Sequence, residues 1–231
     1  MASLNSRTFA LVTGGSGGIG SALCRALPSV GLIPLVGFNS NAKIAKSLAK
    51  ECGGFAVKMD MSDDGSIVTA IENISTYIED DGVLRGVILA ASPAPDLIPF
   101  RSLNADLLVN QFRVNVVGSQ LLLAGLIKTF FKKDRSGIII GILSEAIGSE
   151  NQPPTSGMGA YIIAKSAMKV MLRICSVEYP WLKVRTISPG FTKTKMLDVF
   201  DPRYLELAQS EKQFSTPEEV AELIINLLRC P

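Results

Sequence analysis

Residues 13–20 read Thr-Gly-Gly-Ser-Gly-Gly-Ile-Gly, and this glycine-rich stretch decides the fold. It follows a short apolar run, Phe9 to Thr13, and leads directly into an amphipathic run, Ile19 to Leu27. Glycines let the backbone approach a ligand closely, and the amides at a helix N-terminus attract an anion. A plain turn between strand and helix needs only one or two glycines. The stretch therefore predicts a loop that binds the phosphates of a dinucleotide, through Gly14, Ser16, Gly18, Ile19 and Gly20.

Outside this loop, short apolar runs alternate with longer amphipathic runs along the whole chain. This pattern predicts one α/β domain over residues 1–231, a doubly wound parallel sheet with helices on both faces. The expected strands are Phe9 to Thr13, Ile33 to Phe38, Phe55 to Lys58, Val83 to Ala90, Gly137 to Leu143 and Val184 to Ser188. The expected helices are Ile19 to Leu27, Ala42 to Cys52, Asp64 to Asp80, Val114 to Phe131, Ala160 to Tyr179 and Thr216 to Arg229.

Charge, apolar runs and cysteine spacing limit the partners and the cellular compartment that we expect for this protein. The formal net charge is +2, without a basic stripe, so we expect no nucleic-acid partner. The N-terminus does not resemble a signal peptide, and no uninterrupted apolar run approaches the roughly 18 residues of a membrane span. Four widely spaced cysteines form no Cys-x-x-Cys pair. We therefore expect a cytoplasmic protein that does not enter a membrane.

The chain contains no histidine, which excludes Ser-His-Asp and Cys-His catalysis and any imidazole metal ligand. We expect no metal site. Acid–base chemistry must then use other side chains, and Tyr161 and Lys165 are candidates because they lie four residues apart, one turn along a predicted helix. Such a pair is more often a surface feature. Here it follows a phosphate loop and begins the helix after the fifth predicted strand.

The glycine loop followed by Tyr-x-x-x-Lys resembles the short-chain dehydrogenase/reductase family, and the resemblance extends over nearly the whole chain. It implies a Rossmann-type fold and an NAD(P)-dependent oxidoreductase that interconverts a carbonyl and a secondary alcohol. Tyr161 would be the acid–base, and Lys165 would lower its pKa and hold the nicotinamide ribose. Ser144 would bind the substrate oxygen. Asn115 matches the family's Asn-Val-x-Gly motif and would support a water chain to the lysine, although it could simply cap a helix.

The same resemblance assigns further contacts to the cofactor. Asp60, with Met61 beside it, corresponds to the position that contacts adenine, although Asp60 could instead form a helix-start turn with Asp63. Ala90 and Ala91 would offer backbone contacts. The Pro-Gly stretch that closes over nicotinamide corresponds to Pro189, Gly190, Thr192 and Thr194.

Three features depart from the family pattern. The usual Asn-Asn-Ala-Gly after the fourth strand is replaced by residues 89–92, Leu-Ala-Ala-Ser, so a bracing side-chain amide is missing. Ser144 and Tyr161 are 17 positions apart, more than usual, and Ser149 is a rival at shorter spacing. We prefer Ser144 because it directly follows the strand. The strand that commonly follows the last helix is apparently missing.

The segment after the second predicted strand favours NADP(H) over NAD(H), which stays possible. An acid there would bind the ribose hydroxyls of NAD and repel a ribose phosphate. The segment carries Asn39, Ser40 and Lys43 instead, which could form a phosphate pocket. They could also be a helix cap and a solvated lysine. The arginine common in the loop of NADP-dependent relatives is absent, with Gly17 in its place.

Three functions compete on these grounds. The first is a carbonyl reductase acting on a small ketone or keto-ester. Its substrates would include a 3-oxoacyl thioester whose phosphorylated arm meets Lys193, Lys195 and Arg203. The second is an NAD-dependent alcohol or sugar dehydrogenase. The third is a nucleotide-binding sensor or interaction protein without turnover. Loss of the catalytic Tyr or Lys would mark the third, and both are present. We expect a homodimer formed through the helices at 114–131 and 160–179.

Overall fold

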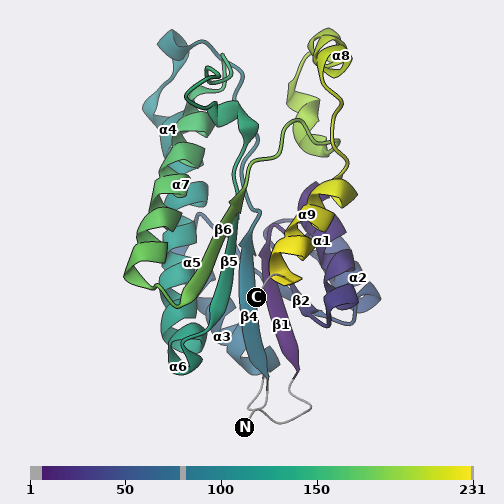
Figure 1. Cartoon of the computed structure of the whole chain (residues 1–231), viewed down its shortest axis with the longest axis vertical. Coiled ribbons are helices and arrows are strands. Elements are labelled where there is room, and N and C mark those ends of the chain that lie inside the picture. The colour runs from purple at the N-terminus through teal and green to yellow at the C-terminus, as the bar shows by residue number, and fades with distance from the viewer. Residues whose placement is uncertain (1–6, 79–81, 230–231) are drawn as a thin grey trace.

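Six parallel strands form one sheet in the order β3-β2-β1-β4-β5-β6 (Figure 1). The computed structural model describes residues 7–78 and 82–229. The strands are β1 (Thr8–Thr13), β2 (Ile33–Phe38), β3 (Phe55–Lys58), β4 (Val83–Leu89), β5 (Gly137–Ile142) and β6 (Leu182–Ile187). The predicted doubly wound fold is confirmed. Because the order reverses between β1 and β4, the carboxyl ends of these two strands mark the crevice where such sheets bind ligands.

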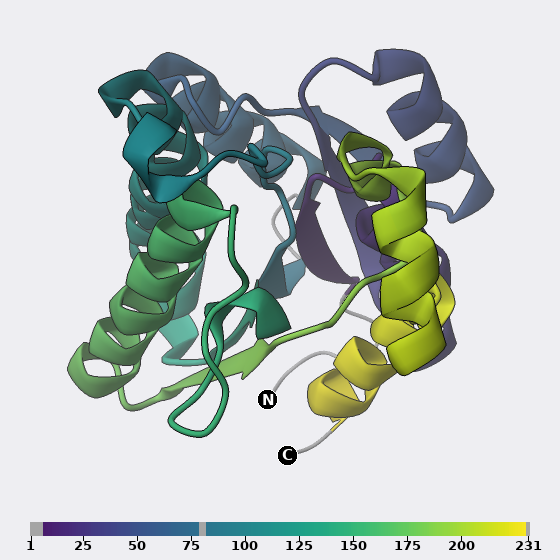
Figure 2. The ribbon, with the colours of Figure 1, turned by 90° about the horizontal axis from the view of Figure 1, so that it is seen from above.

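Helices cover both faces of the sheet, as Figure 2 shows from above. They are α1 (Gly18–Ala26), α2 (Ala42–Glu51), α3 (Asp64–Ile78), α4 (Ala105–Phe112), α5 (Ser119–Leu126), α6 (Lys132–Asp134), α7 (Gly159–Glu178), α8 (Pro202–Glu211) and α9 (Pro217–Arg229). In β1, Phe9 and Leu11 pack into the core on the side of α3, α5 and α7, whereas Ala10 and Val12 pack toward α1, α2 and α9. All four side chains are fully buried, which explains why the strand reads as a continuous apolar run.

A capping box stands at the start of α9. The Thr216 N–H donates to Glu219 Oε2 at 2.7 Å, and the Glu219 N–H donates to Thr216 Oγ1 at 3.1 Å. Helix α9 packs along α1, the helix that begins at the glycine loop. This contact fixes the direction of α1 and therefore the position of the loop.

The predicted helix at 114–131 is the central part of a longer helical run. That run extends from Ala105 to Asp134 and contains π-helical turns at Arg113–Gly118 and Ile127–Phe131. It begins earlier than predicted because the Asn104 side chain caps it, accepting a hydrogen bond from the Leu107 N–H at 3.0 Å.

By length and composition alone, the same run could cross a membrane. The absence of an uninterrupted apolar run of that length in the sequence did not predict this. Its most apolar 18 residues have a mean hydropathy of 1.5. Core helices of folded domains pass the same test. Here the run packs against α3 and α7, and 44% of those residues are buried within the protein.

Another segment differs from the prediction. No helix is expected between Phe191 and Phe214, but this segment contains a 3₁₀ turn at Lys195–Val199 and helix α8. Asp201 caps α8 and Pro202 occupies its first turn. The helix buries no residue, but its Tyr204 packs against Phe191 and Phe200. The last two residues of the helix predicted at 64–80 lie outside the described residues, as does Cys230.

Candidate active site

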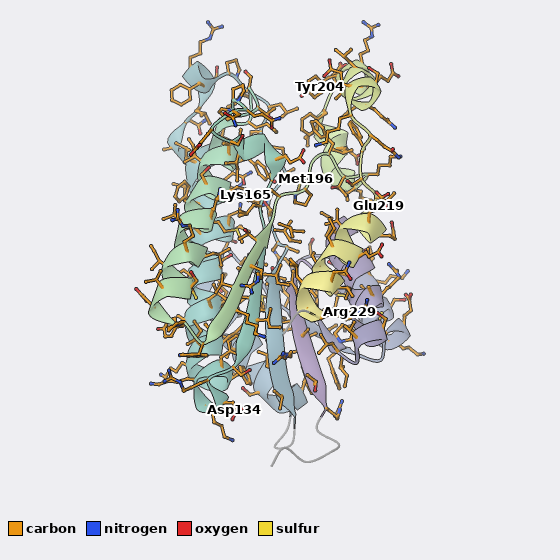
Figure 3. All side chains as sticks on the ribbon, viewed as in Figure 1. Asp134, Lys165, Met196, Tyr204, Glu219 and Arg229 are labelled. Atoms are coloured by element: carbon orange, nitrogen blue, oxygen red, sulfur yellow. The ribbon has the colours of Figure 1, made fainter. Side chains whose placement is uncertain are left out.

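A cavity of about 600 Å³ opens at the carboxyl edge of the sheet. Its walls come from the ends of β4, β5 and β6, the first turns of α7, and the segment that carries α8. In Figure 3, Lys165 on α7 and Met196 on the α8 segment lie at this end of the molecule, and both line the cavity. The cavity also brings together many of the residues predicted for the site: Ile19, Ala90, Ser144, Tyr161, Lys165, Pro189, Gly190, Thr192 and Thr194.

Tyr161 lies in the first turn of α7 and is 8% exposed. Burial raises the pKa of its phenol, and a hydrogen bond with the Ser144 hydroxyl lowers the pKa by a smaller amount. The phenol therefore carries its proton at neutral pH. This differs from the sequence-based expectation of a lowered pKa, because desolvation disfavours the phenolate in the absence of a strong cationic contribution.

Lys165 lies one turn further along α7 and is 2% exposed. Its Nζ donates to the carbonyl oxygen of Ile142 at 2.9 Å and lies 5.7 Å from the centre of the Tyr161 ring. Burial lowers the pKa of Lys165 to about 7. The amine is thus poised between its charged and neutral forms near neutrality, so a nearby negative group would draw it toward the ammonium.

Ser144 follows β5 and caps the 3₁₀ turn Glu145–Ile147, where its Oγ accepts from the Ala146 N–H at 3.2 Å. The same hydroxyl bonds Tyr161. Ser149, the rival serine, is exposed, pairs with Gln152 and is not in the cavity wall. The structure therefore joins Ser144, Tyr161 and Lys165 in one group.

Asn115 is fully buried in the π-helical turn at 113–118, within a continuous helical run, so it does not cap a helix. Its Nδ2 donates to the carbonyl oxygen of Gln111 at 3.0 Å and to Gln111 Oε1 at 3.1 Å. Its Oδ1 accepts no hydrogen bond from the described residues. Gln111, which sequence reasoning missed, is also fully buried and donates to the carbonyl oxygen of Ala94 at 2.8 Å. Asn115 is therefore held by its neighbour one turn earlier.

The glycine loop fits the phosphates of a dinucleotide. Gly14 has a φ of +63°, and a Cβ there would lie 2.9 Å from the Cα of Ala91. A Cβ on Gly20 would lie 2.2 Å from the carbonyl oxygen of Gly14. The N-cap residue Gly17 has no side chain to occupy the first amides of α1, and the first turn carries no acid. These amides are therefore available to an anion.

The missing amide after β4 is replaced by a hydroxyl. Thr13 Oγ1 accepts hydrogen bonds from the N–H groups of Ala90 and Ala91, both at 3.0 Å. This arrangement braces β4 against β1 at the cavity edge. On its other side the loop meets the Pro-Gly segment, because a Cβ on Gly18 would lie 2.3 Å from Thr194 Cγ2. Ser16 is half-buried within the loop.

The residues predicted to bind the adenosine half of the cofactor differ from one another in exposure and bonding. Asn39, Ser40 and Lys43 are exposed at the end of β2 and the start of α2. Asp60 accepts from the Ser62 N–H at 2.8 Å and the Ser62 hydroxyl at 2.6 Å, and these bonds hold the pKa of its carboxyl below the usual value. This resembles the turn alternative, with Ser62 as partner. The side chain of Met61 is 5% exposed and packs in the core, which leaves only its backbone for a contact with a cofactor.

The basic residues expected to meet a carrier arm lie outside the cavity wall. Lys193, Lys195 and Arg203 are all exposed. The lysine of this segment that does line the cavity is Lys212, whose Nζ lies 2.6 Å from Glu145 Oε2 across the pocket. The described residues contain no cluster of three or more His, Cys, Asp or Glu side chains suited to a metal ion.

The sheet order, the open glycine loop and the buried tyrosine–lysine pair define a dinucleotide-dependent oxidoreductase. The chain matches the family described as short chain dehydrogenase over residues 8–204. It belongs to this family and is an oxidoreductase acting on CH–OH groups.

Individual relatives are distant but cover nearly the whole chain. A 3-oxoacyl-[acyl-carrier-protein] reductase of Bos taurus is 26% identical over 224 residues, 95% of this chain and 90% of the relative. A Brucella melitensis 3-ketoacyl-(acyl-carrier-protein) reductase, complexed with NADH, has a TM-score of 0.84 at 19% identity, with 96% and 91% of the two chains covered. The Thermococcus sibiricus alcohol dehydrogenase, complexed with 5-hydroxy-NADP, has a TM-score of 0.80 at 24% identity, covering 97% and 91%. The structural likeness supports the fold.

Proposed function

We propose that this protein is an NADPH-dependent carbonyl reductase with Tyr161 as its proton donor. The observation that carries the proposal is the buried group of Tyr161, Ser144 and Lys165 in one cavity. Burial keeps the phenol protonated at neutral pH. A protonated donor favours reduction of a carbonyl, whereas oxidation of an alcohol would need the phenolate.

In this mechanism the chain binds and orients the carbonyl and moves one proton. A bound nicotinamide supplies the hydride. The hydroxyls of Ser144 and Tyr161 donate to the carbonyl oxygen, and Tyr161 passes its proton to that oxygen as negative charge develops there. Lys165 in its ammonium form stabilises the resulting phenolate and holds the nicotinamide ribose. Asn115 supports the lysine through a water chain, as the family resemblance implies.

The cavity supports a substrate with an apolar portion. Phe191 packs against Phe200, Tyr204 and Phe214, with ring centres 5.3, 6.2 and 5.0 Å away, and all four residues line the cavity. Ketones and keto-esters fit this description, and 3-oxoacyl thioesters are included because a relative is named for that reaction.

The direct test measures oxidation of NADPH by the purified protein with a panel of ketones, keto-esters and a 3-oxoacyl thioester, followed by cofactor absorbance. Turnover of at least one carbonyl supports the proposal. Turnover only of alcohols with NAD would favour the dehydrogenase. Tight NADPH binding without turnover across the panel would favour the nucleotide-binding sensor.

We expect kcat/KM to be higher with NADPH than with NADH. The end of β2 carries the neutral side chain of Asn39, which does not repel a ribose phosphate. Asn39→Asp should reverse or erase the preference by placing a carboxylate there. Asn41→Asp, two residues further along, is the matched comparison for an added charge. Equal values for both cofactors in the wild type would contradict this prediction.

We also expect a homodimer. Exposed apolar side chains form a surface on α7 and the long helical run, which lie side by side in Figures 1 and 2. They are Val109, Val117, Ile163, Val170, Ile174 and Val177, each at least 37% exposed. Contiguous exposed apolar surface is typical of an interface. Light scattering should give twice the chain mass.

A pair of charge substitutions locates the interface. Ile174→Lys should shift the protein toward the monomer, whereas Val68→Lys, at an equally exposed position on α3, should not. A wild-type monomer at working concentrations, or equal effects of both substitutions, would count against this surface.

A further inference from the structure

Lys58 occupies a position that sequence reasoning did not single out. It is the last residue of β3, and the strand register pairs it with Phe38, the last residue of β2. The side chain is exposed, yet its ammonium is held in place. Nζ donates to the carbonyl oxygen of Asn39 at 2.5 Å and to Asn39 Oδ1 at 2.7 Å.

The partners of Lys58 leave its charge available. Both bonds go to neutral oxygens, and no described carboxylate lies within 4.0 Å of this ammonium. Asp60, two residues further along, bonds Ser62 and the Asn39 side chain, and the Lys58 charge lowers the pKa of its carboxyl without forming an ion pair within 4.0 Å. A phosphate brings the opposite charge that these two neutral oxygens lack, and ammonium–phosphate bonds are charge-assisted at both partners. The ammonium has three N–H donors and Asn39 offers two acceptors, so one donor stays available to an anion while Asn39 holds the other two.

The fold places this ammonium where a dinucleotide presents its adenosine ribose. The glycine loop at the end of β1 takes the pyrophosphate, and the ribose then lies at the end of the adjacent strand β2. Residues paired across parallel strands point to the same face, and Phe38 packs toward α1 and α2. Lys58 therefore extends from the same side of the sheet as the loop and the first turn of α2.

We infer that Lys58 is the residue that selects NADP(H), by binding the 2′-phosphate while Asn39 holds the ammonium in position. The inference rests on the proposed preference for NADPH and assigns that preference to a particular side chain. Lys43, which is exposed in the first turn of α2, is the competing cation, but no described contact holds it in place.

The test is a calorimetric titration with 2′,5′-ADP and with 5′-AMP, which differ only in the 2′-phosphate. Lys58→Met should weaken 2′,5′-ADP binding roughly tenfold or more, the loss expected for a charge-assisted bond, and change 5′-AMP binding less than about twofold. Lys58→Arg should restore most of the affinity. Lys50→Met, at the opposite end of α2, is the control for lost surface charge and should leave the ratio of the two affinities unchanged.

The possible outcomes distinguish a failure of the Lys58 assignment from a failure of the proposed NADPH preference. If the wild type prefers 2′,5′-ADP and Lys58→Met keeps that preference, the NADPH proposal stands and the assignment of Lys58 is wrong. The assignment is also wrong if Lys43→Met alone removes the preference, or if Lys58→Met weakens both ligands equally. A wild type that binds both ligands equally would refute both proposals.

Discussion

Tyr161→Phe should lower kcat for carbonyl reduction by roughly 10²- to 10⁴-fold, the usual contribution of a general acid. The substitution removes only the phenolic oxygen. The aromatic ring stays, so the packing of a side chain that is 8% exposed should be preserved. NADPH affinity should change less than about twofold, because the glycine loop and Lys165 are intact. The measurement is steady-state kinetics together with direct titration of NADPH.

The matched control is Tyr179→Phe, at the far end of the same helix, where the ring packs against Trp181. It should retain wild-type kcat. A Tyr161→Phe enzyme that kept more than about a tenth of wild-type kcat would identify another proton donor. A rise in KM with unchanged kcat would instead point to a role of the hydroxyl in binding.

The sequence was sufficient for most of the fold because the four central strands, β1, β2, β4 and β5, are largely buried on both faces. Such strands read as short continuous apolar runs, and β2, which ends at Phe38, has the predicted bounds. Helix α8 was not predicted because it buries no residue, and its apolar positions, which lie between Tyr204 and Ala208, are too few to stand out as a helical period. The early start of the long helix depended on Asn104, whose cap is a weaker signal than periodicity.

The site residues also fall into those that local spacing predicts and those that depend on contacts between distant segments. Tyr161 and Lys165 were predictable because four residues along a helix place two side chains on one face. The hydrogen-bond partners of Asn39 and Ala94 were not predictable from the sequence. Lys58 reaches Asn39 only because the register of β2 and β3 brings the two strand ends together, 19 residues apart in the chain. Gln111 reaches Ala94 across 17 residues, through the placement of α4 above the β4 edge.

Lys165→Met should abolish most turnover and at the same time make the free protein more stable. The wild-type fold buries an amine whose one described hydrogen bond goes to the Ile142 carbonyl. Burying a charge without a counter-charge costs free energy, and methionine matches the length of the stem. The expected gain is on the order of 2 kcal/mol near pH 6. At about 2–4 °C per kcal/mol, Tm should rise by several degrees.

The pH dependence of this gain distinguishes charge burial from better packing. The pKa of Lys165 is about 7 in the fold, against 10.5 as the ordinary value. Below pH 7 both the folded and the unfolded chain hold the proton, so the folded state carries the full free-energy cost of burying the charged amine. Between pH 7 and 10.5 the unfolded chain binds more protons than the fold, and wild-type stability rises with pH from this group.

The Tm advantage of Lys165→Met should therefore be largest at pH 6 and shrink by pH 9. Lys169→Met, one turn further along α7 at an exposed position, should show no such trend. An advantage of Lys165→Met that is equal at both pH values would mean that packing, not charge, limits stability at this position. A loss of stability at pH 6 would mean that the bond to Ile142 outweighs the cost of burial. With the expected trend, this lysine lowers the stability of the free enzyme and is retained for its role in the reaction.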